Sequence, residues 1–240
     1  MTDSSTTPWA GALSASSAAS PKMARALLAC GMAAGPLFIV AALVQGLTRD
    51  GFELNRHPAS LLSNGDLGWI QITNFLVTGL LTVAFAVGMR RTLVGGLGGI
   101  WGPRLVGIYG LLGMIAAGVF LPDAADGFPP GTPAGQPKSV SWHGLLHFAS
   151  AGVGFLCLIV GCFVIARRFA SLGQRGWAAY SRITGVLFLA GFIGLASGSG
   201  HTAAVLAFWF GVVVAWVWVA LLAARLRAGV LEATRPTSAE

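Results

Sequence analysis

Six long apolar segments alternate with short polar segments along the chain. They are residues 26–47, 69–89, 105–121, 142–166, 183–200 and 202–224, and none has an Asp, Glu, Lys or Arg in its interior. A helix of about 20 apolar residues crosses the hydrocarbon core of a bilayer, and a charge at its centre would be costly. The segments also lack the strict alternation of a membrane β-barrel. The pattern therefore predicts an all-α polytopic membrane protein with six transmembrane helices in one bundle.

The two flanks of this region have a different character. Residues 1–21 are rich in Ser, Thr and Ala, and we expect a disordered tail there because little apolar surface is available for burial. The apolar run that follows Lys22 and Arg25 is longer than the core of a signal peptide, so we expect a retained first span. These features predict a transmembrane domain over residues 22–227 and a flexible C-terminal tail over residues 228–240.

Composition excludes a soluble enzyme. Hydrophobic residues make up 55% of the chain, charged residues only 10%, and the mean hydropathy is +0.75. Soluble domains carry about 25% charged residues, which are needed to cover a water-facing surface. The net charge of +7 comes from basic residues in short runs between apolar segments. Such runs orient helices in a membrane and do not form a continuous face for nucleic acid, so a nucleic-acid partner is not expected.

The distribution of basic residues predicts the orientation. Twelve of the 15 Lys and Arg residues lie on the side of the bundle that carries both termini, and only Arg49, Arg56 and Lys138 lie on the other side. Basic loops stay on the cytoplasmic side during insertion. We therefore expect a multi-pass protein of the plasma membrane with both termini in the cytoplasm.

Polar residues with reactive side chains concentrate on the predicted outer side. Five of the eight acidic residues and most of the histidines, including His201, fall there. Two long connections, residues 48–68 and 122–141, carry the majority of them. Because long loops on one face of a rigid scaffold commonly carry function, we expect a functional site at the outer face.

Two histidines begin the fourth span at a helical spacing. His143 and His147 are four residues apart, so a helix places both imidazoles on one face, about 6 Å apart along the axis. They are candidate zinc ligands, for which His57, Asp66, Asp123 or Asp126 would complete the shell. Alternatively, the two rings hydrogen-bond a neighbouring loop, and the sequence leaves both interpretations open.

The first long connection contributes further candidates. Arg56 is a candidate for an anionic head group, and Pro58 suits the first turn of a short helix that carries Ser60 and Ser63. Asp66 precedes the second span, where it is either a helix-dipole partner or a base. In the second connection, prolines and glycines forbid a regular helix and fix an irregular path. This path either holds Asp123 near His143 or forms a stiff, solvated loop, and the sequence leaves both interpretations open.

Several of these segments together resemble a known family. They are Arg56-His57-Pro58, Ser60-Leu61-Leu62-Ser63, residues 65–72 (GDLGWIQI), residues 127–131 (GFPPG) and residues 142–147 (WHGLLH). The chain from Arg25 to Arg225 resembles the bacterial membrane-protein family named domain of unknown function 998. The resemblance implies a multi-helix integral membrane protein, and it implies no activity, substrate, cofactor or catalytic residue.

Two functions remain open at the outer site. The first is binding of a lipid, a small amphiphile or a partner membrane subunit by Arg56, His57, Ser60, Ser63, Asp66, Asp123, His143 and His147. The second is a metal-dependent hydrolase in which His143, His147 and His57 bind zinc and Asp66 or Asp123 acts as base. His143 and His147 share one helix face, so they cannot sandwich a haem between them.

Overall fold

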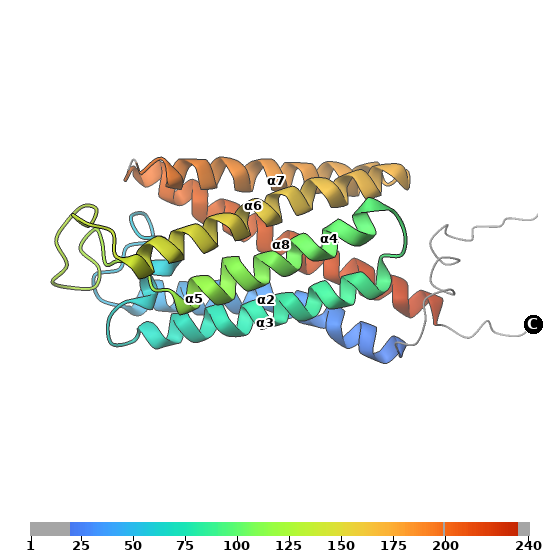
Figure 1. Ribbon diagram of the computed structural model, residues 1–240, viewed down its shortest axis with the longest axis horizontal. Helices are drawn as coiled ribbons and strands as arrows, with labels where there is room; N and C mark the ends of the chain where they lie inside the picture. The colour runs from blue at the N-terminus through green and yellow to red at the C-terminus, as the bar shows by residue number, and fades with distance from the viewer. Residues whose placement is uncertain (1–19, 199, 235–240) are drawn as a thin grey trace, which may run out of the picture.

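The computed structural model describes residues 20–198 and 200–234, and this part of the chain is helical with irregular connections (Figure 1). The elements are α2 (Pro21–Thr48), η1 (Ala59–Ser63), α3 (Gly68–Thr92), α4 (Gly96–Ile108), η2 (Tyr109–Ala116), α5 (Ala117–Val119), α6 (Trp142–Ser171), α7 (Arg175–Ala196) and α8 (Thr202–Ala233). Six helices are long and apolar enough to span a membrane, with α4, η2 and α5 forming the third. The predicted fold class is confirmed, and the chain is a multi-pass membrane protein.

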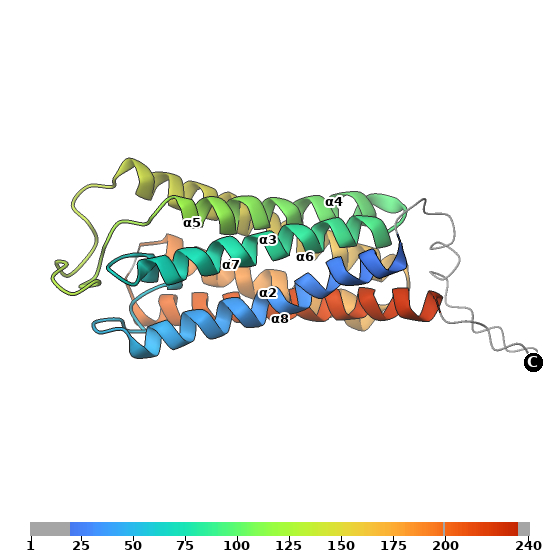
Figure 2. The same cartoon turned by 90° about the horizontal axis from the view of Figure 1, so that it is seen from below.

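The spans form a closed ring. Each packs against the next one along the chain, and α8 packs back against α2 (Figures 1 and 2). Their long axes run along the same direction, so the connections gather at two ends. We call the end with residues 49–67 and 120–141 the long-loop end, and the opposite end, where α2 begins and α8 ends, the terminal end.

The observed helices extend beyond several predicted segments. The fifth span begins at Arg175, eight residues before its predicted start, and ends at Ala196, four residues before its predicted end. The helix α8 continues to Ala233, so the first part of the predicted C-terminal tail is helical. Backbone hydrogen bonding extends a helix past its apolar run, because charged side chains at the ends reach water. The predicted disordered segment at residues 1–21 lies outside the described residues, apart from its last two.

The third span changes its winding at mid-length. It starts at Gly96, nine residues before the predicted boundary, and residues Tyr109–Ala116 form a π-helical segment between two α-helical parts. Such segments are rare and often occur at functional sites. Here the π-helical segment lies where η2 packs against α3 and α6.

Polar residues also connect the spans within the bundle. Gln45 of α2 donates a hydrogen bond to the Gln71 side chain of α3 over 2.8 Å, and Asn74 donates to the carbonyl of Phe38 over 3.2 Å. All three polar side chains are buried. In a medium without water, such bonds satisfy polar groups and fix the relative position of two helices.

Candidate functional site

A cavity of about 480 Å³ opens between the spans at the long-loop end. Its polar lining comprises Arg56, Ser60, Asp123, Asp126, Gln136 and His147, with the first five on the two long connections. The aromatic lining, contributed by all six spans, comprises Phe38, Phe75, Tyr109, Phe148, Phe155, Phe192, Phe208, Trp209 and Trp216. Polar groups at the mouth and apolar walls inside are the usual composition of a small-molecule site.

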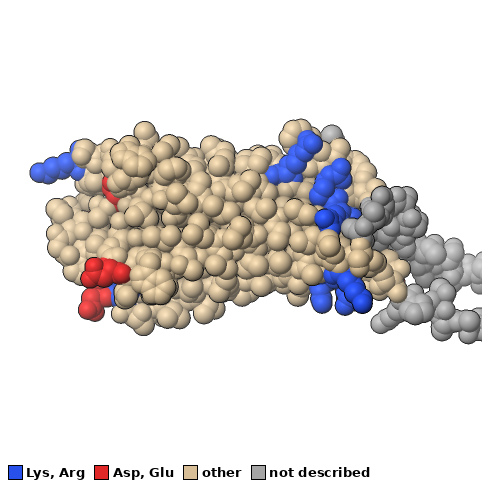
Figure 3. Space-filling view, turned by 60° about the horizontal axis from the view of Figure 1, so that its bottom comes forward, with Lys and Arg blue, Asp and Glu red and all other residues tan. Residues whose placement is uncertain are grey.

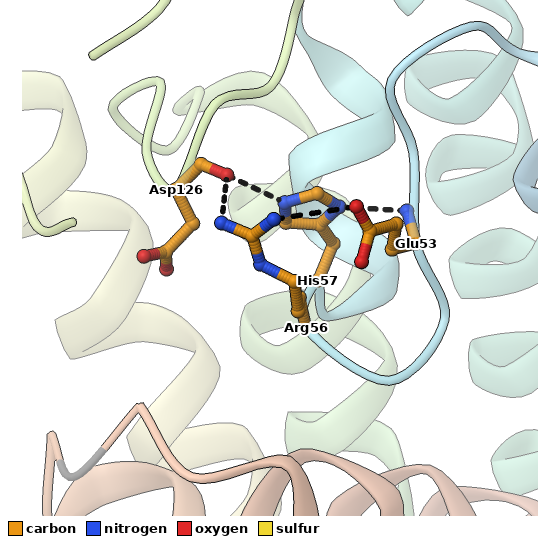
Figure 4. Close-up of polar contacts among 4 residues, drawn as sticks. All are labelled: Glu53, Arg56, His57 and Asp126. Carbon is orange, nitrogen blue, oxygen red and sulfur yellow. Dashed lines mark hydrogen bonds and ion pairs between the residues drawn. The ribbon is translucent and has the colours of Figure 1, made fainter. Parts of the chain in front are cut away.

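The two long connections meet at the main-chain oxygen of Asp126 (Figure 4). Arg56 donates to this oxygen over 3.1 Å and also pairs with the Glu53 carboxylate at 3.2 Å. The buried His57 contacts the same oxygen through Nε2 at 3.1 Å, while its Nδ1 accepts the Glu53 backbone N–H at 2.9 Å. Because Nδ1 is an acceptor, Nε2 carries the proton and donates. Both ring nitrogens of His57 are therefore used by the main chain.

The backbone conformation of Asp126 directs its carbonyl oxygen toward Arg56 and His57. The residue has φ of 54°, a left-handed conformation that Asp tolerates better than bulkier residues. The Gln136 amide donates to its side chain over 3.1 Å, which fixes the second connection at the cavity mouth. From the opposite wall, Trp209 of α8 donates to the carbonyl of His57 over 3.0 Å. His57 thus lies where both connections and α8 join.

Arg49 fixes the end of the first connection, a role that the sequence did not indicate. Its guanidinium donates to the carbonyls of Leu62 and Asn64 and lies 4.9 Å from the centre of the Phe128 ring. Burial lowers the pKa of Arg49, and the charge of Asp66 offsets part of this effect. One basic side chain therefore connects the end of α2, the end of η1 and the second connection.

The predicted histidine pair stabilises the end of α5. His143 contacts the carbonyl of Leu121 through Nδ1 at 2.8 Å. The Nδ1 atom of His147 contacts the carbonyls of Ala117 and Phe120 at 2.8 and 2.9 Å. The last carbonyls of a helix have no partner within it, so imidazole N–H groups satisfy them here. The spacing of four residues lets both rings reach the same neighbouring segment, as one of the two interpretations expected.

Asp123 stabilises the start of α6 in the same region. Its carboxylate accepts the Ser141 backbone N–H at 2.9 Å, and Ser141 Oγ accepts the Gly144 N–H at 3.0 Å as a helix cap. Burial of Asp123 acts to raise its pKa, but the hydrogen bonds from Ser141 and the nearby His143 outweigh burial, so the pKa is lowered. Asp123 is therefore held close to His143, as one of the two interpretations of this connection expected.

The structure divides the predicted site residues into two groups. Arg56, Ser60, Asp123 and His147 line the cavity, whereas His57, Ser63, Asp66 and His143 do not. The four lining residues come from both long connections and α6, and they form the mouth of the cavity. Asp66 is exposed and lies just before α3, and Ser63 is buried within η1, the predicted short helix.

The proposed zinc ligands are not assembled around one point. Among residues 20–198 and 200–234, no three His, Cys, Asp or Glu side chains lie close enough together to hold a metal ion. His57 offers no free ring nitrogen, because both are hydrogen-bonded to the main chain. The zinc site stays a prediction, and this conformation provides no third ligand for it.

The aromatic interior was missed by the sequence-based reasoning. Tyr109 is one of only two tyrosines in the chain and lies midway along an apolar span. A hydroxyl at that position in an apolar segment is the sequence feature that could have indicated a site there. Gly113, four residues further along the same span, also lines the cavity.

The chain was compared with known proteins. A family model described as "Protein of unknown function (DUF998)" matches residues 32–225, which is most of the chain. No curated protein and no solved structure matches it. The chain belongs to the DUF998 family.

Proposed function

We propose that this member of the DUF998 family binds a lipid or another small amphiphile in the cavity between its spans. The observation that carries the proposal is the order of the lining, with polar groups on the two connections and aromatic side chains within the bundle. An amphiphile has the matching order of a polar head and an apolar body. The volume of about 480 Å³ lies within the range of about 300–1,000 Å³ that is typical of small-molecule sites.

The proposal includes an orientation. Lys and Arg side chains gather near the terminal end, whereas the acidic side chains visible in Figure 3 lie at the long-loop end. Positive charge favours the cytoplasmic side, so we place both termini in the cytoplasm of a cell with this protein in its plasma membrane. The mouth of the cavity then opens toward the outer leaflet, from which an amphiphile enters.

Hydrolysis receives less support than binding. A metal-dependent hydrolase needs an ion with an open position and a positioned base. The buried His57 is held by the main chain through both ring nitrogens, and Asp123 is held at the start of α6. Both side chains therefore stabilise the two long connections around the cavity, and this role supports a binding site.

The test compares a variant that fills the cavity with one that does not. Gly152 lines the cavity, and a Cβ added there would lie 3.7 Å from Phe192, an ordinary contact. Gly152→Phe should therefore fill the space. The neighbouring Val153 faces outward with 47% exposure and does not line the cavity, so Val153→Phe is the matched control.

Native mass spectrometry of protein extracted with its membrane lipids gives the readout. We expect wild type and Val153→Phe to retain one amphiphile per chain and Gly152→Phe to lose it. Equal lipid retention by both variants, at equal thermal stability, would contradict a ligand inside the cavity.

A further inference from the structure

Tyr109 places a polar atom among the aromatic walls of the cavity. The side chain is 3% exposed, lines the cavity, and begins the π-helical segment Tyr109–Ala116. Its ring packs against Trp216 with 5.5 Å between ring centres. The carbonyl of Ala117, which His147 contacts nearer the mouth, is eight residues further along this span. This separation is about two helical turns, so Tyr109 belongs to the deep part of the site.

The Tyr109 side chain is buried and lines the cavity, and within residues 20–198 and 200–234 its hydroxyl makes no hydrogen bond. Buried tyrosine hydroxyls normally find a partner, because an unmade hydrogen bond in an apolar medium is costly. The side chains that line the cavity with it are mainly hydrocarbon, including Phe38, Met114 and Phe155. The missing partner therefore has to come from an occupant of the cavity.

A simple acyl chain does not supply that partner. Its inner end is a methyl group, which would leave the hydroxyl of Tyr109 unpaired. An occupant with an oxygen at its inner end would satisfy the hydroxyl, and its remaining surface would still have to suit aromatic walls. Aromatic side chains favour edge-to-face and offset contacts with planar rings. Phe38, Tyr109 and Trp216 already make such contacts with one another, at 5.5 and 5.6 Å between ring centres.

The lining of the cavity extends to the outer surface of α6. Phe148 lines it and is 58% exposed, and Gly152 on α6 and Gly194 on α7 line it without side chains. An apolar tail can leave the bundle at this point and continue into the bilayer. The occupant can thus keep its polar ring inside and its tail in lipid.

We propose that the ligand is a quinone-type lipid, whose ring lies among the aromatic residues and whose carbonyl oxygen accepts the Tyr109 hydroxyl. Its tail passes between α6 and α7. This inference rests on the proposed function, because it names the class of amphiphile that the same cavity binds.

The experiment uses two ligands with the same tail. Decylubiquinone and decylbenzene are titrated into purified wild-type protein in detergent, and binding is measured by calorimetry. We expect saturable binding of one decylubiquinone and clearly weaker binding of decylbenzene, which lacks the oxygen. Equal affinity for the two ligands would overturn the inference.

Two conservative variants complete the test. Tyr109→Phe keeps the ring and removes the hydroxyl, so we expect decylubiquinone to bind about 2- to 12-fold more weakly, as for one lost hydrogen bond. Tyr180→Phe changes the other tyrosine, which does not line the cavity, and should leave affinity unchanged. Unchanged affinity in Tyr109→Phe, as when a water molecule satisfies the hydroxyl, would also overturn the inference. If Tyr109→Phe does not fold, the comparison of decylubiquinone with decylbenzene in wild type still tests the inference.

A third probe separates this inference from the proposed function. Lysophosphatidylcholine is titrated into wild type and Tyr109→Phe under the same conditions. If it binds both equally and decylubiquinone does not bind, the amphiphile site stands and the quinone inference falls. If neither ligand binds, both proposals fall.

Discussion

The imidazole of His57 donates a hydrogen bond to the main-chain oxygen of Asp126, 69 residues further along the chain. This bond joins the two long connections at the mouth of the cavity. Trp209 of α8 donates to the carbonyl of His57 itself, so one residue couples both connections to the last span. The shape of the mouth therefore depends on a neutral histidine whose ring nitrogens are both satisfied.

Replacing His57 should destabilise the protein. His57→Ala leaves the Glu53 N–H without its partner in a part-buried setting, and the Asp126 carbonyl keeps only its bond from Arg56. One unsatisfied group costs about 1–3 kcal/mol, so we expect a loss of about 1–3 kcal/mol and a lower thermal midpoint in detergent. His201 is exposed, and His201→Ala should change the midpoint little. Equal midpoints for the two variants would contradict the role assigned to His57.

The sequence predicted the spans well because hydrophobicity acts locally. Runs of apolar residues must become helices in a bilayer, whatever surrounds them. It also predicted that His143 and His147 share a face, since helix periodicity determines this. The position of Asp123 near His143 stayed one of two interpretations, because the path of an irregular connection depends on contacts distant in the sequence. The hydrogen-bond partners of the two histidines were not predictable. Histidine and arginine side chains here bind main-chain carbonyls, which every residue carries, so no sequence pattern marks the acceptor.

The cavity was not predictable for a related reason. It arises where six spans fail to fill the centre of their ring, and this depends on how each helix is rotated and wound. The π-helical segment that begins at Tyr109 changes which residues of the third span face inward. No apolar or glycine pattern in residues 105–121 distinguishes that winding from a regular α-helix.

Arg49 should be more important for stability than the neighbouring Arg56. Arg49→Lys loses a guanidinium that binds the carbonyls of Leu62 and Asn64 together, and an ammonium cannot reproduce that planar geometry. We expect a loss of about 1–3 kcal/mol, because hydrogen bonds from charged groups are among the stronger ones. Arg56→Lys affects an exposed pair with Glu53 and an exposed bond to the Asp126 carbonyl, and exposed contacts of this kind contribute about 0–1 kcal/mol. Thermal unfolding of both variants checks this order.

The lowered pKa of Asp123 predicts a dependence of stability on acid. The folded state favours the ionised carboxylate, so its contribution is complete above the unfolded pKa of about 3.9 and is lost as pH falls through the lower folded pKa. Asp123→Asn removes this titration. We therefore expect the thermal midpoint of wild type to fall more steeply than that of Asp123→Asn below about pH 4. Parallel profiles for the two proteins would show that the carboxylate of Asp123 does not stabilise the start of α6.

The closest approach of α6 to the π-helical segment depends on glycine. A Cβ at Gly154 would collide with the backbone of Gly113, which a small rotation of a side chain cannot relieve. Gly154→Ala should therefore push α6 away from the third span and lower the thermal midpoint. The helix α7 offers a control at Gly176, where an added Cβ meets nothing within 4 Å. There, Gly176→Ala should be neutral or raise stability by up to about 1 kcal/mol, since alanine favours helix over glycine.

These two alanine variants also test how the cavity is bounded. Gly113 of η2 and Ala151 of α6 both line the cavity close to the contact between Gly154 and η2. A wider separation of α6 from η2 should therefore widen the cavity. We therefore expect Gly154→Ala to bind amphiphiles more weakly than Gly176→Ala when both are compared at a temperature where each is folded. A variant that loses stability but keeps wild-type affinity would mean that the glycine contact supports the bundle without shaping the cavity. The two results are distinguished by titrating one amphiphile into both variants, after thermal unfolding has shown that each variant is folded at the temperature used.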